Sequence, residues 1–277
     1  MDSLLPPIVH PPRGGLPVLL SVPHSGRDYP GWLVDGARRG RRSLEALEDP
    51  LVDRLVWRAL GRGTGAVIAR APRAAVDCNR AEDEIDPAMV TGTRGARTTP
   101  RARGGLGIVP SRTAADGHLW RQPIDRAELE QRLQAAYRPY HSAIEEQLRL
   151  LSDRFGCAIL LDCHSMPATK SAPAVVFGDR FGRSAAPWVM AEAIAVAAGL
   201  GFDASANDPF AGGHILDRHG SPQSGIHALQ VELDRRAYLD SDSQPRAGFG
   251  RVAALFEALA ERLGAALLDR RLAPAAE

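Results

Sequence analysis

The chain has 277 residues, of which 44% are hydrophobic and 24% charged, and its formal net charge is +1. This length and apolar content predict a folded protein with a sizeable core, and the near-neutral charge argues against nucleic acid or a membrane surface as its main partner. The N-terminus has no basic segment, its first apolar run (Leu16 to Val22) is short, and the three cysteines lack paired spacing. We therefore expect no secretion signal, membrane span or disulfide framework, but a protein of the reducing cytoplasm.

The first strand that we expect leads directly to a histidine. Residues 1–15 are rich in proline and glycine and predict an irregular leader. The apolar run over 16–22 then predicts a buried strand, which Pro23 ends just before His24. Ligands in open α/β sheets bind beyond the carboxyl ends of the strands, so His24 is well placed for a site.

Residues 43–60 carry leucine and valine at helical spacing. Pro50 suits the first turn of a helix that has Asp49 as its N-cap. Asp49 and Asp53, four residues apart, would then share one helix face. Two interpretations remain open at this point. These residues are either a cap and a solvated charge, or a metal ligand (Asp49) and a supporting carboxylate (Asp53).

Two short strands are expected next, over 66–71 and 74–78, followed by Asn79 and Arg80. An arginine offers a bidentate grip on a carboxylate and an asparagine adds a donor, so this pair is a candidate contact for a substrate carboxylate. Residues 92–122 show no periodicity. We expect a long loop there, acting as a positively charged lid near an anionic substrate.

A second strand ends in a histidine after an amphipathic helix over 125–154 that Pro139 interrupts. Apolar residues from Ala158 lead to Asp162, Cys163 and His164, which repeats the arrangement at His24. Histidines at the ends of two neighbouring buried strands can converge. Together with a carboxylate they form a ligand set that zinc prefers, and a catalytic site keeps one position open.

The C-terminal part supplies a candidate general base. A strand over 173–177, a helix over 184–198 and a strand ending at Glu232 are expected. A final helix starts after residue 244, with a short tail at 270–277. A carboxylate at a strand end that faces two histidines suits a metal hydrolase, although an exposed edge glutamate is the alternative.

Six segments together resemble the N-formylglutamate amidohydrolase family. They are Ser21-Val-Pro-His24-Ser-Gly26, Glu48-Asp49-x-x-Val52-Asp53-Arg54-Leu55, Val76-Asp-x-Asn79-Arg80, Asp162-x-His164-Ser-Met-Pro167, Gly178-Asp-Arg-Phe-Gly182 and His227-Ala-Leu-Gln-Val-Glu232. They follow the order of the family and span roughly residues 16–240. The resemblance implies one α/β domain over 1–277. Its fold would be a three-layer α/β/α sandwich around a mixed, mostly parallel sheet, as in zinc carboxypeptidases and the phosphorylase/hydrolase-like proteins.

The resemblance also implies an activity, the metal-dependent cleavage of N-formyl-L-glutamate to formate and L-glutamate in histidine degradation. One Zn²⁺ per chain is expected, with cobalt or manganese as other divalent metals. His24, His164 and Asp49 are the implied metal ligands, and Glu232 is the implied general base.

Two arginines are implied to contact the substrate. Asn79 and Arg80 are similar to the carboxylate-binding Asn-Arg pair of the carboxypeptidases, and Arg80 would also stabilise the oxyanion. Arg218 is a candidate for a second carboxylate contact. The zinc carboxypeptidases place a glutamate ligand three residues after the first histidine, where this chain has Arg27. Glu48 and Asp53 therefore remain alternatives to Asp49 as the third ligand.

Three other functions are alternatives to this one. Ser25 or Ser165 could act as a nucleophile beside a histidine, but the sequence has no Gly-x-Ser-x-Gly elbow. A non-catalytic protein that binds acidic amino acids would not need the general base Glu232. A hydrolase of the same chemistry that acts on another N-acyl acidic amino acid or peptide fits the same residues.

Overall fold

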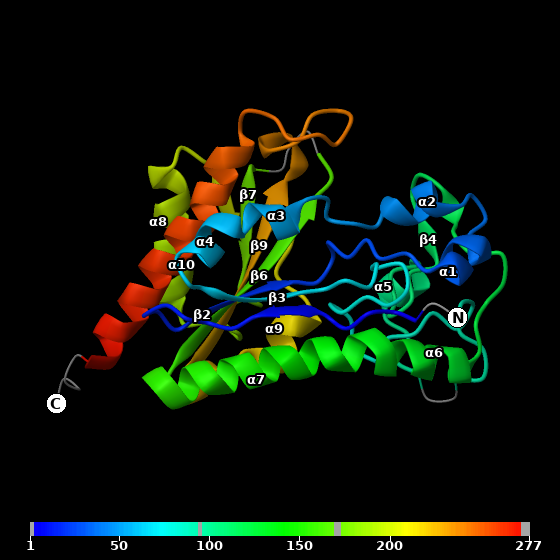
Figure 1. The fold of residues 1–277 in the computed structure, drawn as a ribbon, viewed down its shortest axis with the longest axis horizontal. Coiled ribbons are helices and arrows are strands. Elements are labelled where there is room, and N and C mark those ends of the chain that lie inside the picture. The colour runs from blue at the N-terminus through cyan, green and yellow to red at the C-terminus, as the bar shows by residue number, and fades with distance from the viewer. Residues whose placement is uncertain (1–2, 94–95, 169–172, 273–277) are drawn as a thin grey trace. The chain divides into compact units, whose positions relative to one another are not determined.

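The computed structural model describes residues 3–93, 96–168 and 173–272 (Figure 1). Its contacts divide the chain into two compact units. The first consists of Met1–Ile8, Pro23–Asp49 and Ile68–Ala143, and the second of Val9–Val22, Pro50–Val67 and Ile144–Glu277. Among the described helices, none has the length and apolar run that a membrane span requires.

A seven-stranded sheet, counted over the described residues, forms the centre of the second unit, in the order β1-β3-β2-β6-β9-β7-β8. The strands are β1 (Ile8–His10), β2 (Val18–Val22), β3 (Gly65–Ile68), β6 (Ala158–Met166), β7 (Val175–Gly178), β8 (Ala204–Ala206) and β9 (Ile226–Asp234). β6 pairs in parallel with β2 and with β9. β7 is antiparallel to β9 and parallel to β8, so the sheet is mixed and mostly parallel.

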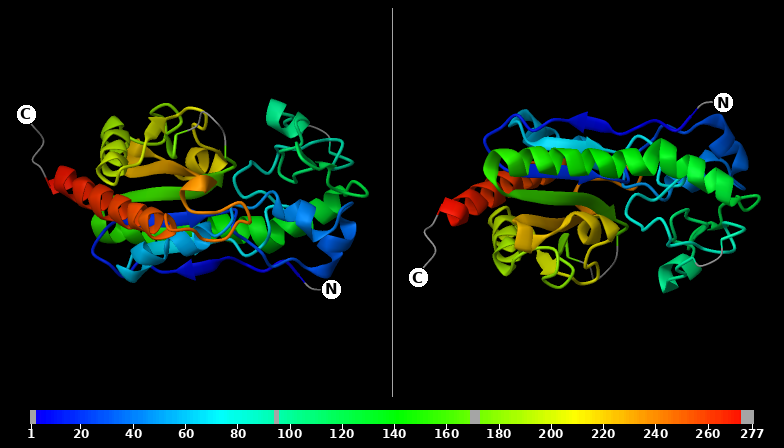
Figure 2. Two further views of the ribbon diagram at one scale, coloured as in Figure 1. Left: turned by 90° about the horizontal axis from the view of Figure 1, so that it is seen from above. Right: turned by 90° about the horizontal axis from the view of Figure 1, so that it is seen from below.

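Helices cover both faces of this sheet. They are α3 (Val52–Leu55), α4 (Trp57–Gly61), α8 (Pro187–Gly199), α9 (His214–His219), α10 (Phe249–Leu272) and the part of α7 (Arg138–Phe155) from Ile144. Short 3₁₀ turns lie at η2 (Pro222–Ser224) and η3 (Arg235–Ala237). α10 packs on β2 and β6 and against α3, α4 and α8, whereas α9 packs on β6 and β9. Figure 2 shows α10 in front of the strands from above and α7 in front of them from below. The predicted α/β/α sandwich is confirmed.

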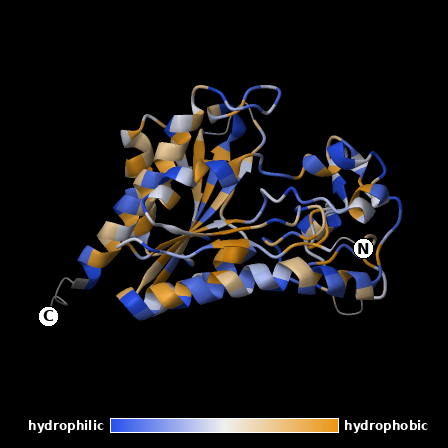
Figure 3. Cartoon of the chain, in the orientation of Figure 1, coloured by the Kyte–Doolittle hydropathy of each residue, from blue (hydrophilic) through white to orange (hydrophobic). Residues whose placement is uncertain are grey.

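β6 lies at the centre of the sheet, between β2 and β9, and its nearly continuous apolar sequence suits this buried position. All nine of its residues are buried, including Asp162, Cys163 and His164. Parallel strands on both sides and helices on both faces favour such a continuous apolar run. In Figure 3 the strands around β6 carry mostly hydrophobic colours, whereas the helices alternate between hydrophobic and hydrophilic residues. The strand therefore brings a few ionisable side chains into an otherwise apolar core.

The first unit contains shorter elements. They are α1 (Gly31–Gly36), α2 (Arg41–Glu45), α5 (Pro100–Arg103), β4 (Arg112–Thr113), β5 (Gly117–His118), α6 (Arg126–Arg132) and a π-helical turn η1 (Leu133–Tyr137) that leads into α7. The predicted helix over 125–154 is confirmed, with Asp125 as the N-cap of α6. Its interruption is the π-helical turn just before Pro139, a residue that lacks an N–H group and crowds the preceding helical turn.

Three predicted strand features differ from the structure. Residues 74–78 are a turn and an extended segment, because Ala75 N–H bonds the carbonyl of Pro72 and Asp77 N–H bonds that of Ile108. The leader expected to be irregular contains β1, which joins the edge of the sheet. β6 does not end at Asp162 but continues to Met166, so His164 lies inside the strand.

The start of the helix predicted from Pro50 also differs from the structure, where α3 and α4 cover 52–55 and 57–61. Leu51 has φ 61° in the left-handed region, so the chain breaks there and α3 starts only at Val52. Asp49 is therefore not a helix cap. Its N–H instead donates to the carbonyl of His24 at 2.9 Å. The loop expected over 92–122 contains α5, β4 and β5, while residues 94–95 of it, and 273–277 of the predicted tail, lie outside the described residues.

Candidate active site

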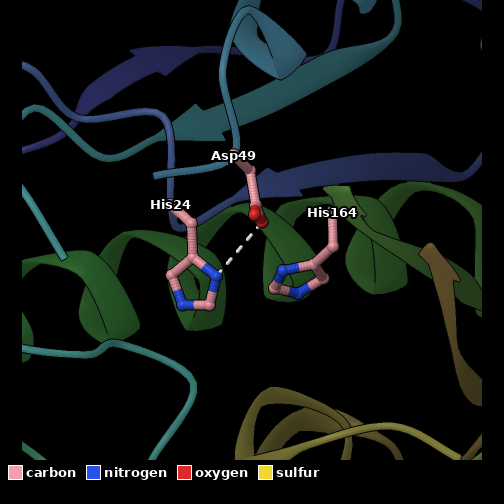
Figure 4. Close-up of side chains that lie close together, drawn as sticks. All are labelled: His24, Asp49 and His164. Carbon is pink, nitrogen blue, oxygen red and sulfur yellow. Dashed lines mark hydrogen bonds and ion pairs between the residues drawn. The ribbon is translucent and has the colours of Figure 1, made fainter. Parts of the chain in front are cut away.

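Three buried side chains lie close together and suit a metal ion (Figure 4). His24, Asp49 and His164 each offer one ligand atom, and these atoms lie within 4.8 Å of one another. His24 Nδ1 is 3.2 Å from Asp49 Oδ2. Two imidazole nitrogens and one carboxylate oxygen are the three-ligand set typical of catalytic zinc, so the residues present fit the implied metal.

Strand register explains how residues 140 positions apart reach the same edge of the sheet. Ser21 of β2 is the Cα partner of Asp162 of β6, and the two strands are parallel. His24 lies three residues beyond Ser21, and His164 lies two beyond Asp162. Because parallel strands advance together, both histidines follow the same level of the sheet. The hydrogen bond from Asp49 N–H to the carbonyl of His24 then places Asp49 beside the first histidine.

A buried carboxylate orients the ring of His24. His24 Nε2 is 2.8 Å from Asp77 Oδ1, and Arg73 Nε donates to Asp77 Oδ2 at 2.8 Å. Burial alone would raise the pKa of Asp77, but Arg73, His24 and Arg80 outweigh it and hold that pKa well below its usual range. Asp77 is thus an anion that accepts a hydrogen bond from the Nε2–H group of His24, which leaves Nδ1 as the nitrogen that a metal would use.

His164 has the same kind of partner on its own strand. Its Nε2 is 2.8 Å from Asp162 Oδ2, and Asp162 Oδ1 accepts a hydrogen bond from Ser21 Oγ at 2.8 Å. Residues two apart on a strand share one face, which explains why Asp162 reaches His164. Carboxylates that hold the second ring nitrogen are typical of metal-binding histidines, because they fix the tautomer and raise the basicity of the ligand.

Glu232 lies next to His164 on the neighbouring strand. The two residues are Cα partners in the parallel pair of β6 and β9, so their side chains leave the sheet on the same face. Glu232 is half-buried, whereas Gln230 is buried and donates from Nε2 to Glu232 Oε1 at 3.2 Å. A carboxylate beside a candidate metal ligand is the position that a general base requires.

Asn79 and Arg80 lie next to Asp77. The N–H of Asn79 donates to Asp77 Oδ1 at 2.8 Å, the same oxygen that contacts His24. Arg80 is buried, and its Nε and Nη1 donate to the carbonyls of Leu106 and Asn79 at 2.9 and 2.8 Å. Burial lowers the pKa of Arg80. The arginine is therefore held rigidly beside the carboxylate that orients His24.

Glu48 and Asp53, the two alternatives to Asp49 as the third metal ligand, have other surroundings. Glu48 accepts a hydrogen bond from Tyr29 Oη at 2.5 Å, and burial raises its pKa to about 7 even though that hydrogen bond opposes the shift. Asp53 lies in α3 and does not belong to the three-residue group found among the described residues.

Arg218, the expected second carboxylate contact, lies in the last turn of α9. Its Nη2 is 2.9 Å from Glu145 Oε1 in α7, so it already pairs with a carboxylate of this chain.

The sequence marks Asp162 only as an ionisable residue near a strand end, and it indicates no role for Asp77 or Gln230. Asp162 and Gln230 each stand two residues before a predicted site residue on a strand, and this period-2 spacing was a usable signal. Asp77 interrupts the apolar run 74–78, but nothing local connects it with His24, which lies 53 positions away.

The fold and these side chains together define an α/β/α protein with a buried His-Asp-His group of the kind that metal-dependent hydrolases use. The chain belongs to the N-formylglutamate amidohydrolase family, whose sequence profile matches residues 16–239. The relatives include the N-formylglutamate deformylase of Pseudomonas aeruginosa, which is 32% identical over 241 residues, or 83% of this chain and 85% of that protein. The N-formylglutamate deformylase of Pseudomonas putida is 30% identical over 238 residues, or 82% and 84%.

Solved structures agree with this placement. The N-formylglutamate amidohydrolase from Ralstonia eutropha JMP134 superposes with a TM-score of 0.87 and 28% identity, covering 97% of this chain and 99% of that one. The gene product Atu2144 from Agrobacterium tumefaciens superposes with a TM-score of 0.66 at 21% identity, covering 98% and 97%, and supports the fold alone.

Proposed function

We propose that this protein hydrolyses N-formyl-L-glutamate to formate and L-glutamate. Membership of the family and the names of the Pseudomonas relatives support this substrate. The observation that carries the chemistry is the pairing of Glu232 with His164 across β6 and β9, next to a buried group that suits a metal. The reaction belongs to histidine degradation in this proposal.

Zinc is the metal that we propose for the group of His24, Asp49 and His164. Asp77 and Asp162 would hold the two imidazoles in the tautomer that a metal requires. A bound zinc ion supplies polarisation of the formyl carbonyl and a lower pKa for the attacking water.

Glu232 acts as the general base in this proposal. It accepts a proton from water as the oxygen adds to the formyl carbon, and it delivers that proton to the amine nitrogen as the C–N bond breaks. The products are formate and the free amino group of glutamate. The hydrogen bond from Gln230 supports this role because it fixes one oxygen of the carboxylate.

Asn79 and Arg80 bind a substrate carboxylate, and Arg80 also stabilises the developing oxyanion. A donor of this kind typically contributes about 3 kcal/mol to the transition state. Two of the N–H groups of Arg80 donate to main-chain carbonyls, which keeps the guanidinium in place for the others. A contact from Arg218 to the second carboxylate would require its ion pair with Glu145 to open.

The compartment that we propose is the cytoplasm. All three cysteines lie among the described residues, and none of them forms a disulfide. Absence of disulfides is typical of proteins in a reducing compartment.

The test combines metal content with product formation. We expect about one zinc per purified chain, formate release from N-formyl-L-glutamate, loss of that activity on chelation and its return with zinc. Metal without formate release would contradict the substrate and direct the search to other N-acyl acidic amino acids. Formate release that persists after complete removal of metal would contradict the metal-dependent mechanism.

A further inference from the structure

Arg101 in α5 is connected to Arg80 by two consecutive hydrogen bonds. The carbonyl of Arg101 accepts the N–H of Leu106 at 2.9 Å, and the carbonyl of Leu106 accepts Nε of Arg80 at 2.9 Å. Thr99 caps α5 by accepting the N–H of Ala102 and donates its own hydroxyl to Glu84. The backbone that carries Arg101 is therefore fixed next to the proposed carboxylate contact.

The charges of Arg73 and Arg101 both act on the guanidinium group of Arg80. Burial is the main cause of the lowered pKa of Arg80, and the charges of Arg73 and Arg101 lower it further while Asp77 opposes the shift. Arg73 is neutralised by the ion pair with Asp77. Arg101 is exposed, and within the described part of the chain it has no hydrogen bond or ion pair from its side chain.

This arrangement fits an anion that the chain itself does not provide. Guanidinium groups repel one another, and a carboxylate between or beside them removes that repulsion while accepting two parallel hydrogen bonds. Arg218 differs in this respect because Glu145 already pairs with it. Within the described part of the chain, the guanidinium of Arg101 is open to the carboxylate of a ligand.

We propose that Arg101 binds the side-chain carboxylate of the substrate while Asn79 and Arg80 bind the other carboxylate. Arg101 is then the residue that selects acidic acyl amino acids over neutral ones. This inference rests on the proposed function, and it identifies the part of the chain that recognises the second negative charge.

The experiment compares N-formyl-L-glutamate with N-formyl-L-glutamine, which has the same shape without the side-chain charge. The variant Arg101→Ala should lower kcat/KM for N-formyl-L-glutamate by about 10- to 100-fold, mainly through KM, because a charge-assisted contact is lost. The value for N-formyl-L-glutamine should change by less than about threefold, since that substrate lacks the partner charge. Arg101→Lys should retain part of the preference, because it keeps the charge but not the bidentate geometry.

Arg103→Ala is the matched control, since Arg103 is an exposed arginine in the same short helix. It should leave both substrates within about twofold of the parent. Equal losses on the two substrates in Arg101→Ala, or no loss on either, would overturn the assignment of Arg101.

Measuring the binding of the product L-glutamate tests the role of Arg101 independently of the proposed reaction. Calorimetry with L-glutamate and L-glutamine needs no turnover, and Arg101→Ala should weaken L-glutamate selectively. Absence of formate release from N-formyl-L-glutamate in the parent would refute the proposed substrate, yet selective weakening of L-glutamate would still support Arg101. Failure of the parent protein to prefer L-glutamate over L-glutamine would overturn the inference.

Discussion

His164 and Glu232 are Cα partners on the adjacent parallel strands β6 and β9. One pairing register therefore sets the separation of a candidate metal ligand from the candidate base. Since a slip by one residue would turn either side chain to the other face, the long buried pairing of these strands is what fixes the site.

Replacing Glu232 by Gln should leave the metal bound and reduce turnover. The amide keeps the size and the hydrogen-bonding capacity of the side chain but cannot accept the proton from water, so kcat should fall by about 10²- to 10⁴-fold. Metal analysis and formate release on the same sample check both parts. Glu261→Gln, at an exposed position of α10, is the control. Full activity in the Glu232 variant would remove this residue from the mechanism.

Asp77→Asn should weaken metal binding although Asp77 is not a member of the ligand group. The neutral amide no longer anchors Nε2 of His24 as an anion does, and a loss of about 10- to 100-fold in zinc affinity is expected. Competition with a chromophoric chelator measures this affinity. Asp83→Asn, at an exposed carboxylate that pairs with Arg97, should leave it unchanged. An unaltered affinity in Asp77→Asn would show that the contact with His24 does not support the metal.

The third ligand can be tested by comparing three carboxylates. Asp49→Asn should lower the zinc content of the purified protein far below one per chain, because one of only three protein ligands is weakened. Glu48→Gln and Asp53→Asn should retain zinc, since neither residue belongs to the group. Retention of a full zinc by Asp49→Asn with loss in either of the other variants would move the ligand to that neighbour.

Acid sensitivity should depend on His219. Burial, and then the charges of Arg218 and His214, lower the pKa of His219 to about 3. The unfolded chain protonates this histidine near pH 6.5, so between these two values it binds more protons than the folded chain. The free energy of unfolding should therefore fall as the pH drops from about 6.5 towards 3.

His219→Gln removes this contribution. The difference in unfolding free energy between pH 7.5 and pH 4.5, measured by urea denaturation, should shrink by about 1–3 kcal/mol. His118→Gln, at an exposed histidine, should keep the pH dependence of the parent. An identical dependence in the His219 variant would show that another group controls acid stability.

The sequence by itself determined the main elements and indicated the three residues that the structure groups as a possible metal site. Apolar runs that end near His24, His164 and Glu232 predicted the central strands, because parallel strands buried on both faces have nearly continuous apolar sequences. The few ionisable residues in or next to such runs then stand out as candidate site residues. The period-3.6 pattern predicted the long helix through α6 and α7. The family motifs linked these local signals to one kind of chemistry.

Only the tertiary structure decided the features that depend on contacts between distant segments. The left-handed conformation at Leu51 broke a helix that propensity favoured, and Asp49 bonded to His24 instead of capping that helix. Asp77 acquired its role from His24, and Arg218 was paired with Glu145. Such choices depend on which groups burial leaves within hydrogen-bonding distance, and local sequence carries no information about partners that lie more than 50 positions away.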